Sequence, residues 1–91
     1  MRYEPLPSFD RSLKRLPKEK KEKVKEAILN LIDFFEKGKK PSGLGLKKLA
    51  KNLWEIRVDI KIRVLFLLED DLVRWCFVGD HNQIRQFIRK E

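Results

Sequence analysis

The stretch LWEIRVDIKIRVLFLLEDD, residues 53–71, alternates between apolar and polar side chains along much of its length. The even positions from 54 to 68 are all apolar. The odd positions begin with a series of charged residues, Glu55, Arg57, Asp59, Lys61 and Arg63. A period of two is typical of strands with one buried face and one face in water. Because nineteen residues are too many for one strand of a small sheet, we expect a tight turn near Asp59 between strands at residues 53–58 and 61–69.

The N-terminal half predicts a short strand followed by a helical hairpin. Residues 2–6 are expected to form a strand near a sheet edge, because they include Pro5. Ser8 is the expected N-cap of a two-turn helix, and Pro17 ends this helix and begins the next. The second helix has a single apolar stripe, typical of a helix that packs on a sheet, and Gly38 is its expected C-cap. The stripe consists of Val24, Ala27, Ile28, Leu31, Ile32 and Phe35.

The C-terminal part predicts one more strand and one more helix. Asp70 and Asp71 favour a turn, and residues 72–78 form the last expected strand. Asp80 is expected to cap the final helix, with Gln83 completing a capping box. The order is strand, two helices, three antiparallel strands and a helix, which predicts an α+β fold with the helical hairpin packed on a small antiparallel sheet. We expect residues 1–91 to form a single domain.

The charge of the chain points to anionic partners. Lys and Arg number 22 against 14 Asp and Glu, which gives a net charge of +8. Such an imbalance suits nucleic acid, an anionic membrane or an acidic protein. However, the N-terminus lacks the apolar segment of a signal peptide, and the longest fully apolar run, residues 64–68, is too short to span a bilayer. We therefore expect a cytoplasmic protein with no membrane contact.

Several kinds of site are unsupported by the sequence. One histidine, His81, and one cysteine, Cys76, do not make a metal site. The glycines of GLGLKK, residues 43–48, lack the preceding strand and the spacing of a phosphate-binding loop. No serine lies in a nucleophile elbow. We therefore expect neither a metal nor a small-molecule cofactor.

A basic surface on the alternating strands is the remaining candidate. Pairing about Asp59 would place Arg57 opposite Lys61 and Glu55 opposite Arg63. Cations that face each other cost some stability, which a bound polyanion would offset because guanidinium groups bind phosphate bidentately. The alternative, equally well supported, is a solvated face whose cations are neutralised by Glu55 and Asp59.

Other basic residues flank these strands. Lys47, Lys48 and Lys51 precede them and either extend the same patch or form ordinary solvated surface, which is commoner for lysine clusters. His81 follows the last strand and can transfer protons near neutral pH, provided that it faces the arginines. A lone histidine in a turn is more often structural. Arg85 lies one helical turn further on, on the same side as His81.

Four segments, in order, resemble the RelE/ParE toxin superfamily of bacterial and archaeal toxin–antitoxin systems. They are LKRLPKEKKEKVKEAI, PSGLGLKKLAKNLWEIRV, IRVLFLLEDD and FVGDHNQI. The resemblance runs from about Phe9 to Phe87, and its most specific piece is GLGLKKL…LWEIRV followed by an arginine-bearing strand. It implies a small antiparallel sheet with a helical hairpin on one side and a short C-terminal helix.

The resemblance also implies a function. The chain would be a type II toxin, a ribosome-dependent mRNA endonuclease that uses no metal and in which the ribose 2′-hydroxyl attacks the adjacent phosphate. By position in the family motifs, Arg57 and Arg63 would stabilise the phosphate and the transition state, and His81 would protonate the leaving 5′-oxygen. The residues expected to bind the RNA backbone are Lys47, Lys48, Lys51, Lys61 and Arg85.

The sequence departs from RelE proper at two positions. Glu55 stands where RelE has a lysine, and Phe87 stands where it has a catalytic tyrosine. Two alternatives therefore stay open, a ParE-like inhibitor of DNA gyrase that is not an enzyme and a nontoxic antitoxin-binding module. The partners implied by the resemblance are an acidic antitoxin, which wraps the helices and the sheet edge, and mRNA on the ribosome.

Overall fold

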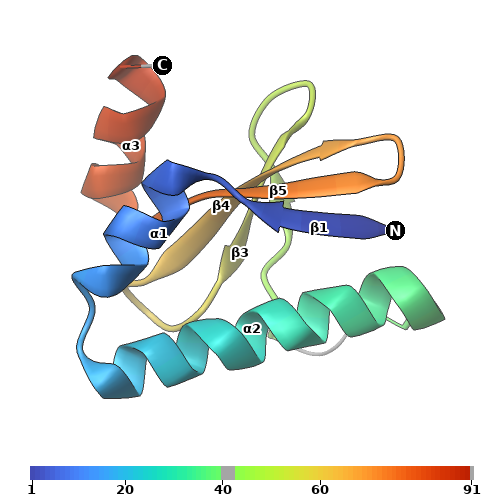
Figure 1. Ribbon diagram of the computed structural model, residues 1–91, viewed down its shortest axis with the longest axis horizontal. Coiled ribbons are helices and arrows are strands. Elements are labelled where there is room, and N and C mark those ends of the chain that lie inside the picture. The colour runs from blue at the N-terminus through green and yellow to red at the C-terminus, as the bar shows by residue number, and fades with distance from the viewer. Residues whose placement is uncertain (40–42, 91) are drawn as a thin grey trace.

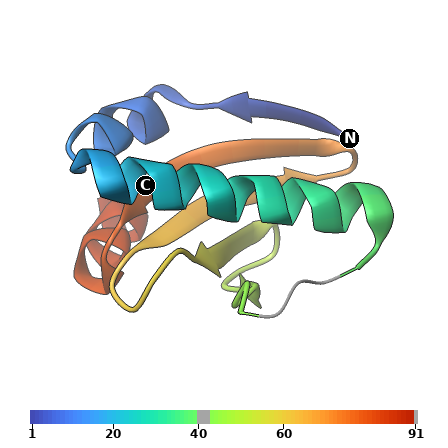
Figure 2. The same ribbon diagram turned by 90° about the horizontal axis from the view of Figure 1, so that it is seen from below.

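The structure is a computed structural model that describes residues 1–39 and 43–90. In chain order its elements are β1 (Arg2–Pro5), α1 (Pro7–Lys14), α2 (Lys18–Lys37), β2 (Lys47–Lys48), β3 (Leu53–Arg57), β4 (Arg63–Glu69), β5 (Leu72–Gly79) and α3 (His81–Lys90). The long helix α2 runs across one face of the sheet, while α1 and α3 lie together at one end of it (Figures 1 and 2). The expected α+β architecture is confirmed. In the described residues, no helix is both long and apolar enough to serve as a bilayer span.

The five strands form one mixed sheet in the order β1-β5-β4-β3-β2. β3, β4 and β5 are the expected antiparallel meander, but β1 pairs with β5 in parallel. The expectation of a purely antiparallel sheet is wrong at this edge, because β1 is joined to the meander through two helices and no tight turn fixes its direction. The two-residue strand β2, which the sequence does not predict, adds antiparallel to the other edge.

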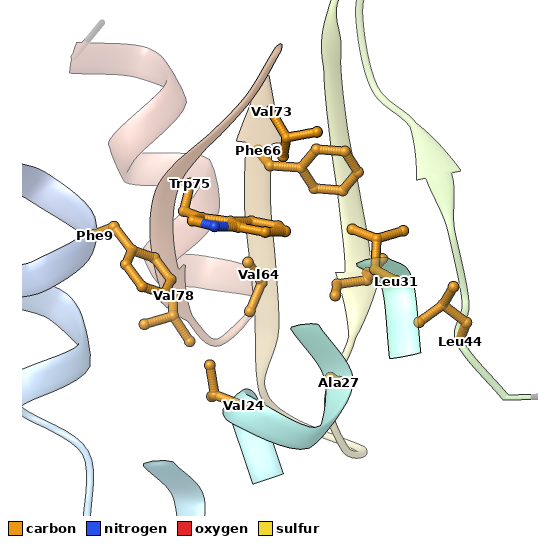
Figure 3. Packing of buried hydrophobic residues seen from close by; sticks show 11 residues of the cluster. Phe9, Val24, Ala27, Leu31, Leu44, Val64, Phe66, Val73, Trp75 and Val78 are labelled. Carbon is orange, nitrogen blue, oxygen red and sulfur yellow. The ribbon is translucent and has the colours of Figure 1, made fainter. Parts of the chain in front are cut away.

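The main core lies between α2 and the sheet face made by the even positions of β3 and β4. Figure 3 shows Val64 and Phe66 from the sheet meeting Val24, Ala27 and Leu31 from the helix. All five are buried, and Phe66 packs edge-on against the ring of Trp75. The remaining members of the predicted stripe, Ile28, Ile32 and Phe35, are partly buried against the same cluster. The predicted stripe is therefore confirmed as the buried face of α2.

The opposite face of the sheet is more buried than the alternation of apolar and polar residues predicts. Leu65 and Cys76 are buried there beneath Ile84 of α3, so the C-terminal helix covers part of this face. Part of this face stays open, because Leu53, Leu65 and Leu67 line a surface pocket on it and Arg57 is exposed toward the β3–β4 turn. An alternating sequence shows that the two faces of a sheet differ in polarity. It does not show whether a helix from a distant part of the chain also covers the more polar face.

The turn between β3 and β4 is longer than expected. One oxygen of the Asp59 carboxylate accepts hydrogen bonds from the backbone N–H groups of Lys61 (2.9 Å) and Ile62 (2.8 Å). These bonds curl the chain, so residues 58–62 leave the ladder and Ile60, counted among the inward positions, is 88% exposed. The predicted register is therefore wrong. Arg57 pairs with Arg63 and not with Lys61, and Glu55 pairs with Leu65 and not with Arg63.

The helix ends follow the sequence signals with one exception. Gly38 caps α2 in the left-handed conformation, and Asp80 and Gln83 exchange two hydrogen bonds of 2.8 Å as the predicted capping box. Ser8, expected to be an N-cap, lies inside α1, because the helix begins at Pro7. Its hydroxyl instead donates to the Cys76 carbonyl of β5 (2.6 Å). One turn later the Ser12 hydroxyl accepts the Val78 N–H (3.0 Å).

Candidate functional site

At the end of the sheet where β3 stops, three residues from neighbouring strands lie side by side. We call Arg57, Arg63 and Gly79 the arginine row. Arg57 of β3 pairs with Arg63 of β4, which pairs in turn with Gly79 of β5. Directly paired residues point to the same face, with Cβ atoms about 4.5–5.5 Å apart. His81 lies two residues beyond Gly79, at the first position of α3, and is exposed. The fold therefore brings the two predicted catalytic arginines side by side and starts the helix that carries His81 at the same edge.

Arg57 is the uncommitted member of the row. It is exposed and forms no ion pair with any residue in the described ranges. Its backbone N–H donates to the Leu44 carbonyl (3.0 Å), which ties the GLGL segment to the edge of β3. A Cβ built on Gly45, whose φ is +61°, would lie 2.9 Å from the Arg57 Cβ. Gly45 is thus a close-approach position that backs Arg57, a role that its spacing in the sequence does not reveal.

Arg63 is held by a carboxylate. Glu55 is only 7% exposed, and its Oε2 lies 3.4 Å from Arg63 Nη1, a long distance for a charge-assisted hydrogen bond. Among the described residues nothing accepts a hydrogen bond from the buried Arg63 Nε. Arg63 therefore keeps an unsatisfied buried donor, its side chain is 22% exposed, and Glu55 neutralises part of its charge.

The turn beside the row is fastened to α2. Lys20 Nζ lies 2.6 Å from Asp59 Oδ2. The hydrogen bond from Lys20, followed by the backbone N–H of Ile62, lowers the pKa of Asp59 to about 2. The Asp59 carboxylate therefore stays ionised at neutral pH and locks the chain segment that separates Arg57 from Arg63.

The predicted RNA-binding residues do not all share one face. Lys47 pairs with Glu55 and so lies on the face of the arginine row. Lys48 pairs with Trp54, and its Nζ sits 5.8 Å from the centre of that ring, on the opposite face. The prediction that Lys48 belongs to the same surface is therefore wrong, because neighbouring strand residues alternate sides.

The other predicted cations are exposed but spread out. Lys51 and Lys61 lie in the loops at opposite ends of β3, and only Lys61 is near the arginine row in the chain. Arg85 lies one turn after His81 on α3, on the same side of the helix. Phe87 stacks on Phe77 with ring centres 4.8 Å apart and belongs to the smaller apolar cluster.

Comparisons with known proteins show which fold this is. No protein-family model matches the chain, and no curated protein matches it by sequence. Solved structures do match. A chain of the DinJ–YafQ complex of E. coli superimposes with a TM-score of 0.74 at 21% identity, over 92% of this chain and 98% of that one. The chain has the RelE/ParE toxin fold.

Two further structures with the RelE/ParE fold superimpose on most of the chain. The RelB–RelE complex of Methanococcus jannaschii gives a TM-score of 0.69 at 17% identity, over 96% of this chain and 98% of that one. The YoeB/ParE toxin of Agrobacterium tumefaciens gives 0.67 at 15% identity, over 89% and 99%. The fold implied by the sequence resemblance is therefore confirmed.

Within the RelE/ParE fold, the arginine row and the nearby histidine carry side chains suited to phosphate chemistry. Two guanidinium groups on rigid strands can hold a phosphodiester from one side and neutralise charge that develops on it. A histidine at the same edge can move a proton. In the described ranges, no three His, Cys, Asp or Glu side chains are grouped closely enough to hold a metal ion.

Proposed function

We propose that this chain is the toxin of a type II toxin–antitoxin system and that it cleaves mRNA on the ribosome. The observation that carries the proposal is the direct pairing of Arg57 with Arg63 at the edge where α3 begins with His81. Two of the superimposed chains come from toxin–antitoxin complexes, which supports the wider toxin assignment. The net charge of +8 suits a polyanionic substrate.

In the proposed reaction, the 2′-hydroxyl of the ribose attacks the neighbouring phosphorus and expels the 5′-oxygen, leaving a 2′,3′-cyclic phosphate. Arg57 and Arg63 bind the non-bridging oxygens, whose negative charge grows in the transition state. His81 gives a proton to the leaving 5′-oxygen. Lys47, which lies on the same face as the row, and Lys61, which lies in the β3–β4 turn, bind the RNA backbone.

The partner in this proposal is an acidic antitoxin. A protein of opposite charge would be steered toward the basic surface and would bind it in competition with RNA. The RelB–RelE and DinJ–YafQ structures are toxin–antitoxin complexes, which supports an antitoxin as the partner.

Induction of the protein in a bacterial host tests the reaction directly. Wild type should arrest growth, and primer extension on a translated message should show cuts inside the coding region. Arg57→Gln and His81→Ala should remove the cuts, while Arg89→Gln, an exposed arginine on α3 outside the row, should keep them. Equal cutting by His81→Ala and wild type would remove His81 from the mechanism, and an uncut message with wild type would remove the activity.

A second candidate is inhibition of DNA gyrase without catalysis. It is favoured by Phe87, whose ring packs on Phe77 and brings no hydroxyl to the site. A supercoiling assay with purified gyrase distinguishes the two, because gyrase inhibition should persist in His81→Ala. A well-folded protein that neither cuts RNA, inhibits gyrase nor arrests growth would be a nontoxic antitoxin-binding module.

A further inference from the structure

A second basic pocket lies where α1 and α3 meet beside β5, and none of its cations belongs to the arginine row. Its volume is about 300 Å³, within the range of pockets that hold small organic groups and far too small for a partner helix. Arg11 and Arg15 of α1 and Lys90 of α3 line it, together with the rings of Phe77 and Phe87. No aspartate or glutamate from the described part of the chain lines it. We call it the α1–α3 pocket.

The three cations of the pocket are available to bind an anion. Arg11, Arg15 and Lys90 are all exposed, and none forms an ion pair with a residue in the ranges 1–39 and 43–90. Arg74 on β5, by contrast, is paired with Glu4. Three like charges around one hollow repel one another, and a bound anion would remove that repulsion.

The pocket also has an aromatic wall. Phe77 and Phe87 are stacked with an interplanar angle of 18°, and both rings are partly exposed. Aromatic rings next to arginines are the usual means of binding single-stranded nucleic acid, because every base can stack and every nucleotide carries a phosphate. An acidic peptide would need the cations but would gain nothing from the rings.

The pocket continues the arginine row across the sheet. Phe77 and Gly79 point to the same side of β5, and a Cβ on Gly79 would lie 2.9 Å from the Phe77 Cε2. Gly79 is the partner of Arg63. The order across the sheet is therefore Lys47 on β2, Arg57 on β3, Arg63 on β4, and then the pocket beyond β5.

We propose that the α1–α3 pocket binds a phosphate of single-stranded RNA through Arg11, Arg15 and Lys90 and packs an adjacent base against Phe77 and Phe87. The inference rests on the proposed function, since the strand is the one whose scissile phosphate lies at Arg57 and Arg63. It assigns a second contact region to that strand, on the side of the row away from Lys47.

The test compares two double variants of equal charge. Arg11→Gln with Lys90→Gln removes one pocket cation from each helix. Lys14→Gln with Arg89→Gln removes two cations from the same helices outside the pocket. All four residues lie in the last turn of their helix, so both variants lose similar helix-dipole interactions.

The measurement is binding of a labelled single-stranded RNA whose 2′-hydroxyls are methylated, so that it cannot be cleaved by 2′-attack. Affinity is followed over a range of salt concentrations. The pocket variant should bind more weakly than the control, and the slope of log K against log salt should become shallower by about 0.7, the value for one lost phosphate contact on a single strand. The control should keep the wild-type slope, and both variants should unfold at the wild-type temperature.

Equal slopes for the two variants would overturn the inference. So would unchanged RNA binding combined with lost binding of an acidic antitoxin, which would assign the pocket to the protein partner. If the double variant fails to fold, Lys90→Gln and Arg89→Gln alone give the same comparison. A slope difference in a protein that cuts no message would uphold the pocket and refute the cleavage reaction, so the two proposals can fail separately.

Discussion

At the scale of single residues, the two paired arginines differ in what holds them. Arg57 is exposed and forms no ion pair within the described residues. The side chain of Arg63, in contrast, is 22% exposed and lies against the buried Glu55 carboxylate. Removing Arg57 therefore takes away only a ligand contact. Removing Arg63 also leaves a buried carboxylate without its cation.

This difference predicts a split between activity and stability. Arg57→Gln should lower cleavage about 10²–10³-fold, the usual cost of one transition-state donor, and leave the free energy of unfolding nearly unchanged. Arg63→Gln should lower cleavage similarly and also destabilise the protein by about 1–3 kcal/mol. Urea unfolding of both variants, beside single-turnover cleavage, measures the two effects. Equal stabilities would show that Glu55 does not depend on Arg63.

Gly45 and Gly43 provide a matched pair for testing how Arg57 is positioned. Both have positive φ, +61° and +80°, so alanine at either should cost about 1–2 kcal/mol of backbone strain. Only the Gly45 Cβ would meet Arg57, at 2.9 Å, while the Gly43 Cβ has nothing within 4 Å. Gly45→Ala should therefore lose much more cleavage than Gly43→Ala, and more stability as well, because the Arg57 Cβ must shift to make room. The same cleavage rate in both variants would mean that the GLGL segment does not set the position of Arg57.

At the scale of elements, the β3–β4 turn and α2 form one unit through Asp59 and Lys20. The pKa of Asp59 is lowered from 3.8 to about 2, so the ionised form is favoured in the folded protein. The resulting stabilisation is complete above about pH 4 and is lost as the pH falls toward 2, because protonation breaks the contact with Lys20.

Asp59→Asn should abolish this pH dependence. The amide oxygen can still accept the two backbone hydrogen bonds of the turn, so the loss at neutral pH should be about 1 kcal/mol or less. The measurement is the urea midpoint of wild type and variant at a series of pH values down to 2, where the two curves should converge. If the two midpoints instead fell in parallel as the pH is lowered, a carboxylate other than Asp59 would be responsible for the loss of stability in acid.

The elements show how far local sequence signals reach. The period of two, the stripe of α2 and the Asp80–Gln83 box each depend on residues close in the chain, and each predicts its element correctly. The register of β3 and β4 depends on a side-chain turn at Asp59, which adds two residues to the loop without any glycine to mark it. The direction of β1 depends on its pairing with the distant strand β5, and the side on which Lys48 lies depends on the pairing of the short strand β2 with β3.

The candidate site shows the same division. The alternating pattern places Arg57 and Arg63 on one face, as in the structure, but it predicts Lys61 and not Arg63 opposite Arg57. It does not reveal Arg11 or Lys90, which come from opposite ends of the chain and meet only because α1 and α3 both pack beside β5. Residues joined by tertiary packing leave no periodic signal in the sequence.

At the scale of the whole molecule, a net charge of +8 on 91 residues opposes compactness and favours an acidic partner. If the toxin proposal holds, co-expression with a neighbouring acidic reading frame should relieve growth arrest. The purified complex should also melt at a higher temperature than the free protein, because a partner that binds only the folded state stabilises it. Raising the salt concentration should reduce that increase, and persistent arrest with no complex on gel filtration would contradict the assignment.

The two serines of α1 have a consequence for how copies of this molecule behave toward each other. β1 ends at Pro5, so the last part of β5 has no neighbouring strand on that side, and there the Ser8 hydroxyl donates to the Cys76 carbonyl and the Ser12 hydroxyl accepts the Val78 N–H. An open ladder at that place would invite a strand from another copy to add on and would seed aggregation. The two serines satisfy these backbone groups with side chains, so copies of the protein would be kept from polymerising through this edge of the sheet.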